Sequence, residues 1–207
     1  PLSLNLGGDG EIRSLKSAEW SGGHVMPLGE ALMAGFYLNE LLLRLLARED
    51  PHPGLFDHYR QAVQMLAQGG ETAMSPTLRG FELLLLRDIG VLPSLDRLTL
   101  LLQPLETDTS YELVPEAGLR QSLDEMENGQ EPRRLGLSGS AWLALNRALH
   151  SESAFIDLVR QLADWDSEER ATLQQQLRGL IHHHCGAEVL KTRQWMMDLQ
   201  KLGSDPS

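Results

Sequence analysis

The stretch from Glu30 to Arg48 constrains the fold more than any other part of the chain. Its apolar residues recur on nearly every face of a helix, and Pro51 and Pro53 lie just beyond its end. A helix that is apolar all round has to be covered by other elements. The stretch therefore predicts a central, buried helix, and 207 residues are enough to build one main core around it.

Other segments carry the spacing and the end signals of helices. The segment from His58 to Gln68 is amphipathic and runs into two glycines. Ser75, followed by Pro76, predicts the first residues of a third helix that ends at Gly90. Further helices are expected over Ser140 to His150, Glu152 or Phe155 to Leu162 with a break near Asp164, Glu168 to Cys185, and Lys191 to Leu202.

Two regions depart from this helical pattern. Residues 92–137 contain Pro104 and Pro115 among short apolar runs, which favours an irregular excursion or a short hairpin. At the amino-terminal end, leucines alternate with small or polar residues, Asp9-Gly10 supplies a turn, and the alternation resumes from Ile12. This second pattern predicts a β-hairpin.

The hairpin has a consequence for the organisation of the chain. Two strands alone are marginal in water, and the chain opens directly into strand-like alternation at Pro1. We therefore expect the hairpin to pair with strands that precede Pro1, so that residues 1–24 end a small β-domain and residues 25–207 form a helical domain. The expected fold class is mainly α.

Composition narrows the possible classes of protein. Hydrophobic residues make up 42% of the chain and charged residues 23%, which is typical of a globular protein. The longest apolar run, Phe36 to Leu46, is broken by polar residues and is too short for the ~20 residues of a membrane span. A single cysteine, Cys185, excludes an intrachain disulfide and favours a reducing compartment, so we expect a cytoplasmic protein without contact to a membrane.

A catalytic serine is the first enzymatic possibility. The segment Gly136-Leu-Ser138-Gly-Ser140 nearly matches a nucleophile elbow, but its last residue is serine in place of glycine and no clear strand precedes it. Helix capping by Ser138 or Ser140 is the favoured interpretation. A small hydrolase using Ser138 and a histidine remains an alternative, although no acidic partner can be identified.

Metal and cofactor chemistry find little support in the sequence. His182, His183 and His184 are adjacent on a helix, so their side chains point about 100° apart and cannot converge on one ion. Cys185 lies at the carboxyl end of that helix, away from the positive end that activates thiolates. We expect no catalytic residues, no metal, no cofactor and no small-molecule substrate.

The distribution of charge is the main argument against a nucleic-acid partner. The formal net charge is −11, whereas phosphate binding draws its affinity from lysine and arginine. Basic residues nevertheless gather between Arg178 and Lys201, where four stand against two acidic residues. On the predicted hairpin, Arg13 and Lys16 precede Trp20, a combination of charge and aromatic surface that suits single-stranded nucleic acid.

Four segments resemble the RecO family of bacterial recombination-repair proteins. Residues 4–19 are similar to the family's Gly-x-Gly-Glu hairpin and the Ala-Glu pair that follows it, and Gly35 to Leu42 to its Gly-x-Tyr-hydrophobic-Asn-Glu-Leu-Leu helix. Residues 78–90 resemble its Arg-x-Phe-Glu-Leu helix, and residues 186–193 its Gly-x-x-x-Leu-Lys-Ser-Arg element. Some relatives carry four zinc-binding cysteines after the third helix, but residues 92–119 contain none.

The resemblance implies a fold and a function. Residues 1–24 would be the end of an amino-terminal OB-fold, and a carboxyl-terminal helical bundle would follow. The implied function is non-catalytic: binding and annealing of single-stranded DNA, and loading of the recombinase at gaps together with RecR. Another implied partner is the acidic carboxyl-terminal tail of single-stranded-DNA-binding protein, for which Arg79 is our candidate contact. The candidate DNA-binding residues are Arg13, Lys16, Arg178, Lys191, Arg193 and Lys201.

A different class of function also fits the sequence. The net charge of −11 favours a helical adaptor that binds only other proteins and makes no contact with DNA. Salt-sensitive binding of DNA would distinguish the two hypotheses, because an adaptor of this kind would not show it.

Overall fold

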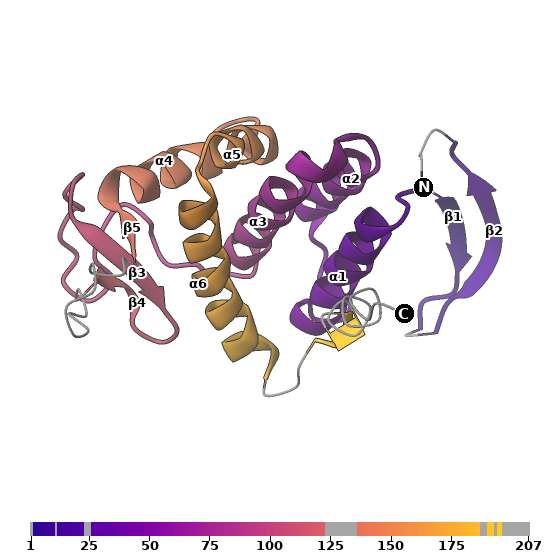
Figure 1. The fold of residues 1–207 in the computed structure, drawn as a ribbon. Helices are drawn as coiled ribbons and strands as arrows, with labels where there is room; N and C mark the ends of the chain where they lie inside the picture. Colours follow the sequence, from indigo (N-terminus) through magenta and orange to yellow (C-terminus); the bar gives the residue numbers. More distant parts are fainter. Residues whose placement is uncertain are drawn as a thin grey trace.

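The computed structural model describes residues 2–10, 12–22, 26–122, 136–186, 190–192 and 194–195. This part of the chain is mainly helical, with a two-stranded antiparallel sheet at one end and a three-stranded sheet at the other (Figure 1). The predicted order of a β-hairpin followed by a helical domain is confirmed. The elements are β1 (Leu2–Gly7), β2 (Ser14–Trp20), α1 (Glu30–Leu45), α2 (Pro53–Gln68), α3 (Gly70–Asp88), β3 (Ser110–Val114), β4 (Gly118–Gln121), β5 (Leu137–Ser138), α4 (Gly139–Leu149), α5 (Ala154–Ala163) and α6 (Ser167–Cys185).

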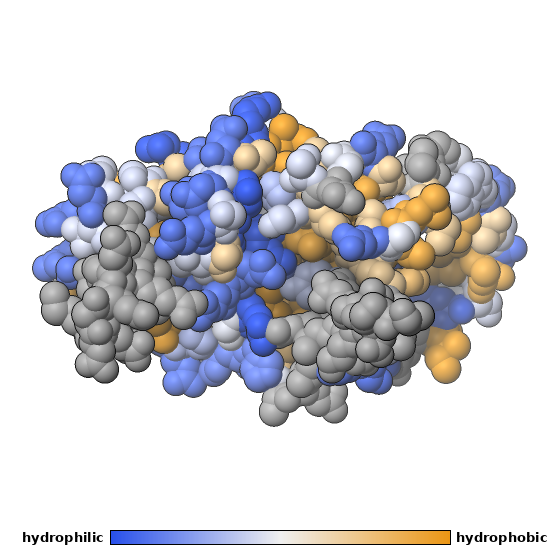
Figure 2. Space-filling view, in the orientation of Figure 1, coloured by the Kyte–Doolittle hydropathy of each residue, from blue (hydrophilic) through white to orange (hydrophobic). Residues whose placement is uncertain are grey.

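The amino-terminal hairpin forms where the alternation predicts it. Strands β1 and β2 pair antiparallel, with Leu2 opposite Trp20 and Leu4 opposite Ala18, and the register shifts at Asn5 and Leu6. Every residue of β2 and nearly all of β1 are exposed. Figure 2 shows hydrophobic surface gathered on the side of the molecule where Figure 1 places this hairpin and α1.

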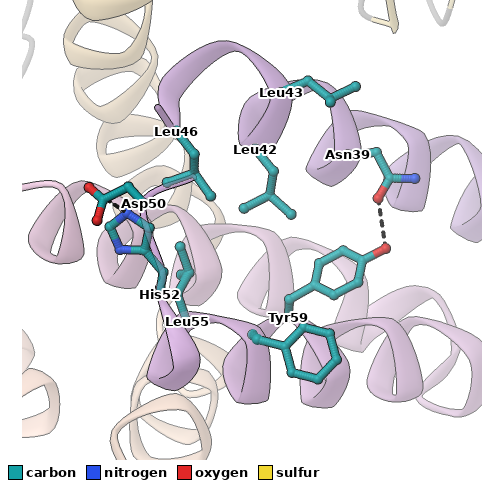
Figure 3. Close-up of a pocket in the computed structure, with 9 residues that line it drawn as sticks. Asn39, Leu42, Leu43, Leu46, Asp50, His52, Leu55 and Tyr59 are labelled. Carbon is teal, nitrogen blue, oxygen red and sulfur yellow. Dashed lines mark hydrogen bonds and ion pairs between the residues drawn. The ribbon is translucent and has the colours of Figure 1, made fainter. Parts of the chain in front are cut away.

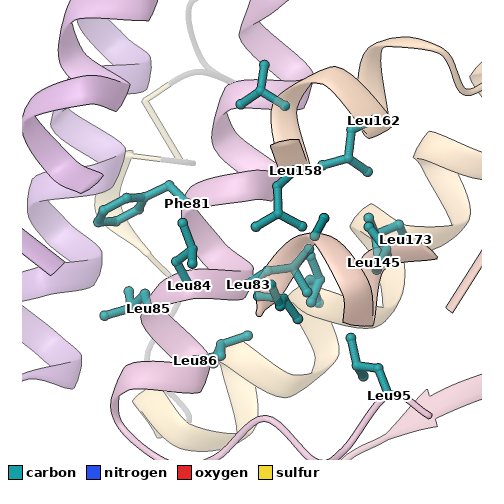
Figure 4. Packing of buried hydrophobic residues seen from close by; sticks show 14 of the residues in the cluster. Phe81, Leu83, Leu84, Leu85, Leu86, Leu95, Leu145, Leu158, Leu162 and Leu173 are labelled. Atoms are coloured by element: carbon teal, nitrogen blue, oxygen red, sulfur yellow. The ribbon is translucent and has the colours of Figure 1, made fainter. Parts of the chain in front are cut away.

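The centre of the core is α3 and not, as the sequence predicts, α1. The consecutive residues Leu83 to Leu86 are all 0% exposed, because α3 packs against α1, α2, α5 and α6 (Figure 4). In contrast, α1 buries Ala34, Leu38 and Leu41 but leaves Leu43 84% exposed.

The sequence also predicts that Phe36, within the apolar stretch of α1, lies in the core; this prediction is wrong, since its side chain is 43% exposed. Helix α1 lies at the side of the bundle, next to the hairpin, so other helices cover only part of its apolar surface (Figure 1). Apolar residues around a helix do not say how many neighbours will cover it.

Three helix ends differ from the predicted ones. Helix α1 ends at Leu45, before Arg48, and α2 begins at Pro53, a position that suits proline because the first helical residues need no N–H donor. Helix α3 begins at Gly70 and passes through Pro76, which cannot donate to the carbonyl of Thr72. The packing of α3 against its neighbours therefore outweighs the loss of one helical hydrogen bond.

The later helices follow their end signals closely. Asp166 caps α6 through its side chain and forms a reciprocal capping box with Glu169, and Gly186 follows the last residue of the helix. Of the expected helix from Lys191 to Leu202, residues 191, 192, 194 and 195 are helical, and the remaining positions lie outside the described residues.

The irregular region contains the short hairpin that its turns favour. Strands β3 and β4 pair antiparallel around a turn that includes Pro115, and β5 adds a third strand. The side-chain oxygen of Gln176 accepts a 2.7 Å hydrogen bond from the N–H of Leu113, and the indole of Trp142 donates to the carbonyl of Tyr111 at 3.1 Å. These bonds attach the small sheet to α6 and α4.

Every described helix falls short of the length or the apolar character needed to cross a lipid bilayer.

Candidate nucleic-acid interface

The hairpin presents two cationic side chains to solvent. Arg13 lies in the turn, in a shallow hollow beside Glu49 and Asp50, and Lys16 lies on β2. Neither makes an ion pair with a residue in the described part of the chain. Trp20, which is 68% exposed, lies four residues after Lys16 on the same strand.

A glycine allows Lys16 to lie across the neighbouring strand. A Cβ atom at Gly7 would come within 2.2 Å of Cε of Lys16, so the aliphatic part of the lysine occupies the space beside this glycine. The position of the cation thus depends on a residue of β1 as well as on its own strand.

The segment that carries Lys191 is attached to α1 by one carboxylate. Glu40 accepts hydrogen bonds from the backbone N–H of Lys191 and of Thr192, both at 2.8 Å, and from the hydroxyl of Thr192 at 2.7 Å. Arg44 donates to the same carboxylate at 3.0 Å. Because free N–H groups mark the first turn of a helix, Glu40 acts as a cap supplied by another helix.

The environment of Glu40 favours its charged form. Burial by itself would raise the pKa of this carboxyl, but the hydrogen bonds from Thr192 and Lys191 and the nearby Arg44 guanidinium lower the pKa below its ordinary value. The neighbouring Asn39 accepts a 2.7 Å hydrogen bond from the hydroxyl of Tyr59 on α2. Asn39 and Glu40, two polar residues within the apolar stretch of α1, thus both form hydrogen bonds to other parts of the chain.

The sequence analysis did not identify one exposed aromatic residue near Lys191 as part of the candidate interface. Trp195 is 52% exposed and lies four residues after Lys191, on the same side of a helix. A large aromatic side chain among the basic residues of this segment is the signal that could have identified it.

The remaining candidate cations are not placed beside the hairpin or beside Lys191 in the described part of the chain. Arg178 is exposed on α6, beside a broad polar hollow lined by Gln174, Gln175 and His182. In Figure 1, α1 lies between α6 and the hairpin. Arg193 and Lys201 lie outside the described residues.

The candidate cations share a property that separates them from many other arginines. Arg13, Lys16, Arg178 and Lys191 are exposed and form no ion pair within the described ranges. Other arginines are each matched with a carboxylate of the chain: Arg44 with Glu40, Arg60 with Asp57, Arg79 with Glu82, Arg97 with Asp96, Arg120 with Glu112, and Arg160 with Asp157.

Arg79, the candidate contact for an acidic peptide, lies inside the protein. It is 7% exposed and donates to the fully buried Glu82 at 2.5 Å, and Tyr37 donates to the same oxygen at 2.6 Å. Burial raises the pKa of Glu82 in spite of these two donors. Arg79 can therefore meet an incoming carboxylate only if its pair with Glu82 opens, and its partner role stays a prediction.

An apolar groove between α1 and α2 was not predicted. The α1–α2 groove has a volume of about 500 Å³, with Leu42 and Leu46 on one wall and Leu55 on the other (Figure 3). The bonded pair of Asn39 and Tyr59 lies at one end. At the other end the ring of His52 lies between Asp50 and Asp88.

The residues considered for catalysis have structural surroundings. Ser138 accepts a 3.2 Å hydrogen bond from the N–H of Ala141 and so caps α4, as its position predicts. His183 lies 3.7 Å from Glu116, and Cys185 is half-buried, with a pKa raised by burial. In the part of the chain that is described, no group of three or more His, Cys, Asp or Glu residues is placed to hold a metal ion.

Comparison with known proteins identifies the family. Residues 28–194 match the family model described as "Recombination protein O C terminal". The chain is 55% identical over 202 residues to the DNA repair protein RecO of Polaromonas sp., and the alignment covers 98% of this chain and 77% of that relative. It is 51% identical over 206 residues to the DNA repair protein RecO of Variovorax paradoxus, with the same two coverages. The chain therefore belongs to the RecO family of DNA repair proteins.

Proposed function

We propose that this chain is a non-catalytic mediator of DNA repair and recombination that binds and anneals single-stranded DNA. The observation that carries the proposal is that the candidate cations Arg13, Lys16, Arg178 and Lys191 are exposed and form no ion pair with any described residue, in a protein of net charge −11. A cation that is already matched with a carboxylate has less to gain from a phosphate, whereas these four side chains are available to one.

The proposed mechanism combines phosphate attraction with base stacking. Arg13 and Lys16 would bind phosphates beside Trp20, and Lys191 would do so beside Trp195. Aromatic side chains stack on any base, so such a surface holds an extended strand without reading its sequence. An extended strand exposes its base edges to a complementary strand, and annealing needs no covalent step.

The proposal extends to the partners, the domains and the location. RecR and the acidic tail of single-stranded-DNA-binding protein are the proposed protein partners, with Arg79 as the contact for the tail once its pair with Glu82 opens.

Residues 1–24 are proposed to complete an OB-fold beside the helical domain of residues 25–207. The exposed apolar surface of the hairpin supports this division, because a further sheet would cover it. The proposed location is the bacterial cytoplasm, in association with the nucleoid.

Fluorescence anisotropy of a labelled single-stranded oligonucleotide, at low and at moderate salt, tests the proposal. We expect binding that weakens with salt and weakens further when Arg13, Lys16, Lys191 and Arg193 are changed to Ala. Each lost phosphate contact should lower the slope of log K against log salt by about 0.7. The same oligonucleotide with its complement reports annealing.

A matched control variant removes the same charge from other positions. Arg60, Arg97, Arg120 and Arg160 are exposed but ion-paired, so changing all four to Ala should weaken binding much less. Equal losses in the two variants would reject the assignment of the site and leave only a general effect of net charge.

The α1–α2 groove favours a second candidate function. Its walls are apolar, and Leu43 and Phe56 beside it are 84% and 61% exposed, which is typical of a surface that binds protein. A protein-only adaptor would use this groove and show no binding of the oligonucleotide at low salt.

A further inference from the structure

Glu40 joins two parts of the chain that are 151 residues apart in sequence. The carboxylate of Glu40 accepts hydrogen bonds from two backbone N–H groups and one hydroxyl of Lys191 and Thr192, and the Glu40 side chain is only 13% exposed. Thr192, which supplies two of these three donors, is 4% exposed, whereas Lys191 beside it is exposed. The contact thus buries one residue and leaves its neighbour facing solvent.

Helix α1 also borders the second group of candidate cations. The turn that follows its end, at Glu49 and Asp50, lines the same shallow hollow as Arg13 of the hairpin. A helix rises 1.5 Å per residue, so Glu40 lies roughly 7.5 Å from the end of α1 at Leu45, and the non-helical residues 46–49 follow. This part of α1 and the turn after it therefore stand between Arg13 of the hairpin and the segment of Lys191.

We propose that Glu40 is a positioning residue for DNA binding: its carboxylate fixes Lys191 and Thr192 on α1 and so holds Lys191 and Trp195 at a set distance from the hairpin. This inference rests on the proposed binding of single-stranded DNA. Glu40 touches no DNA itself, and it acts through the backbone of Lys191.

The inference predicts an effect whose sign is opposite to that of simple electrostatics. Removing a negative charge from an acidic protein should strengthen its attraction for a polyanion or leave it unchanged. Replacing Glu40 by Gln should weaken binding, because an amide offers one acceptor oxygen where the carboxylate offers two, and its NH₂ group faces the N–H donors of the segment.

The experiment compares Glu40→Gln with Glu30→Gln in the whole chain. Glu30 is an exposed acid in the first turn of the same helix, so both variants lose one negative charge from α1. Amide hydrogen exchange of Lys191, Thr192 and Gln194 should become about tenfold faster in Glu40→Gln, the change expected from loss of a helix cap, and stay unchanged in Glu30→Gln. Anisotropy with oligo-dT should show affinity reduced roughly three- to tenfold in Glu40→Gln alone.

A double-mutant cycle separates positioning from general stability. In a background that carries both Lys191→Ala and Trp195→Ala, Glu40→Gln should cause little further loss of affinity, because Glu40 acts through these two residues. A full additional loss would show that Glu40 acts elsewhere and would overturn the inference.

The outcomes for the inference and for the proposed function differ. If the unmodified chain binds oligo-dT in a salt-sensitive way but Glu40→Gln binds as tightly as Glu30→Gln, the positioning role is rejected and DNA binding stands. If the unmodified chain does not bind at low salt, the proposed function fails, and the positioning role fails with it even where exchange rates confirm the cap.

Discussion

The leucines of α3 and those of the hairpin have opposite surroundings. Leu83 to Leu86 are completely buried in the middle of the helical domain, whereas Leu2, Leu4 and Leu6 are 57%, 53% and 46% exposed. Leu2, Leu4 and Leu6 follow the two-residue period of a strand, whereas the four consecutive leucines of α3 point to all faces of the helix. The difference shows that burial depends on how many layers surround an element: the described helices pack around α3 on several sides, whereas the described residues leave the leucines of β1 exposed.

The arginines of the same two regions differ in a similar way. Arg79 on α3 is enclosed and bonded to Glu82, while Arg13 in the hairpin turn is exposed. An arginine inside the helical domain contributes to its stability, and an arginine on the hairpin is available to a partner.

The largest effect on stability is expected from breaking the buried pair. Changing Arg79 to Ala leaves the carboxylate of Glu82 without its cation in a buried site, and it should lower the free energy of unfolding by about 3–5 kcal/mol. Urea denaturation measures the loss. A double variant, Arg79→Ala with Glu82→Ala, should recover part of it, and Arg13→Ala should change stability little. Equal losses of stability for Arg79→Ala and Arg13→Ala would contradict the conclusion that the two arginines have different roles.

A smaller loss is expected from the leucines of α3. Changing Leu84 to Ala removes a completely buried side chain, so the free energy of unfolding should fall by about 2–5 kcal/mol. Denaturation with urea measures it, with Leu100→Ala as the control because Leu100 is 76% exposed. A loss below about 1 kcal/mol would mean that α3 is not the centre of the core.

The pH dependence of stability tests the protonation of Glu82 in its buried pair with Arg79. Because burial raises the pKa of Glu82 above its ordinary value of 4.5, the folded protein holds this proton more tightly than the unfolded chain does. The contribution of Glu82 to stability should therefore be greatest at low pH and decline as the pH rises from about 4.5 through the folded pKa. Denaturation at several pH values should show a flatter profile for Glu82→Gln; an identical profile would contradict the raised pKa.

The smallest effect is expected in the hairpin. Leu4 is 53% exposed, so its replacement by Ala should change the free energy of unfolding by less than about 0.5 kcal/mol. Urea denaturation alongside Leu84→Ala gives the most direct comparison of the two regions. A loss above about 1 kcal/mol would show that Leu4 is covered in solution, for example by a second copy of the chain.

Much of this fold follows from local patterns in the sequence. The Asp9-Gly10 turn with alternating leucines, the cap at Ser138 and the end of α6 at Gly186 each depend on a few neighbouring residues. Such features are determined by backbone geometry and nearby hydrogen bonds, so they can be read without the fold. The motifs that resemble the RecO family are local in the same sense, and they sufficed for the family.

Tertiary structure decided which residues are covered. The central place of α3, the exposure of Phe36 and the continuation of a helix through Pro76 all depend on neighbours far away in sequence. Nothing near Glu40 in the sequence tells that it caps a segment 151 residues away. The spacing of Arg79 and Glu82, three residues apart on one helix, allows their pairing, but only packing encloses the pair. The spacing of apolar residues shows which face of a helix can be buried, whereas packing among several elements decides which residues are buried. Each contact needs two surfaces, and the sequence pattern of a helix describes only the surface of that helix.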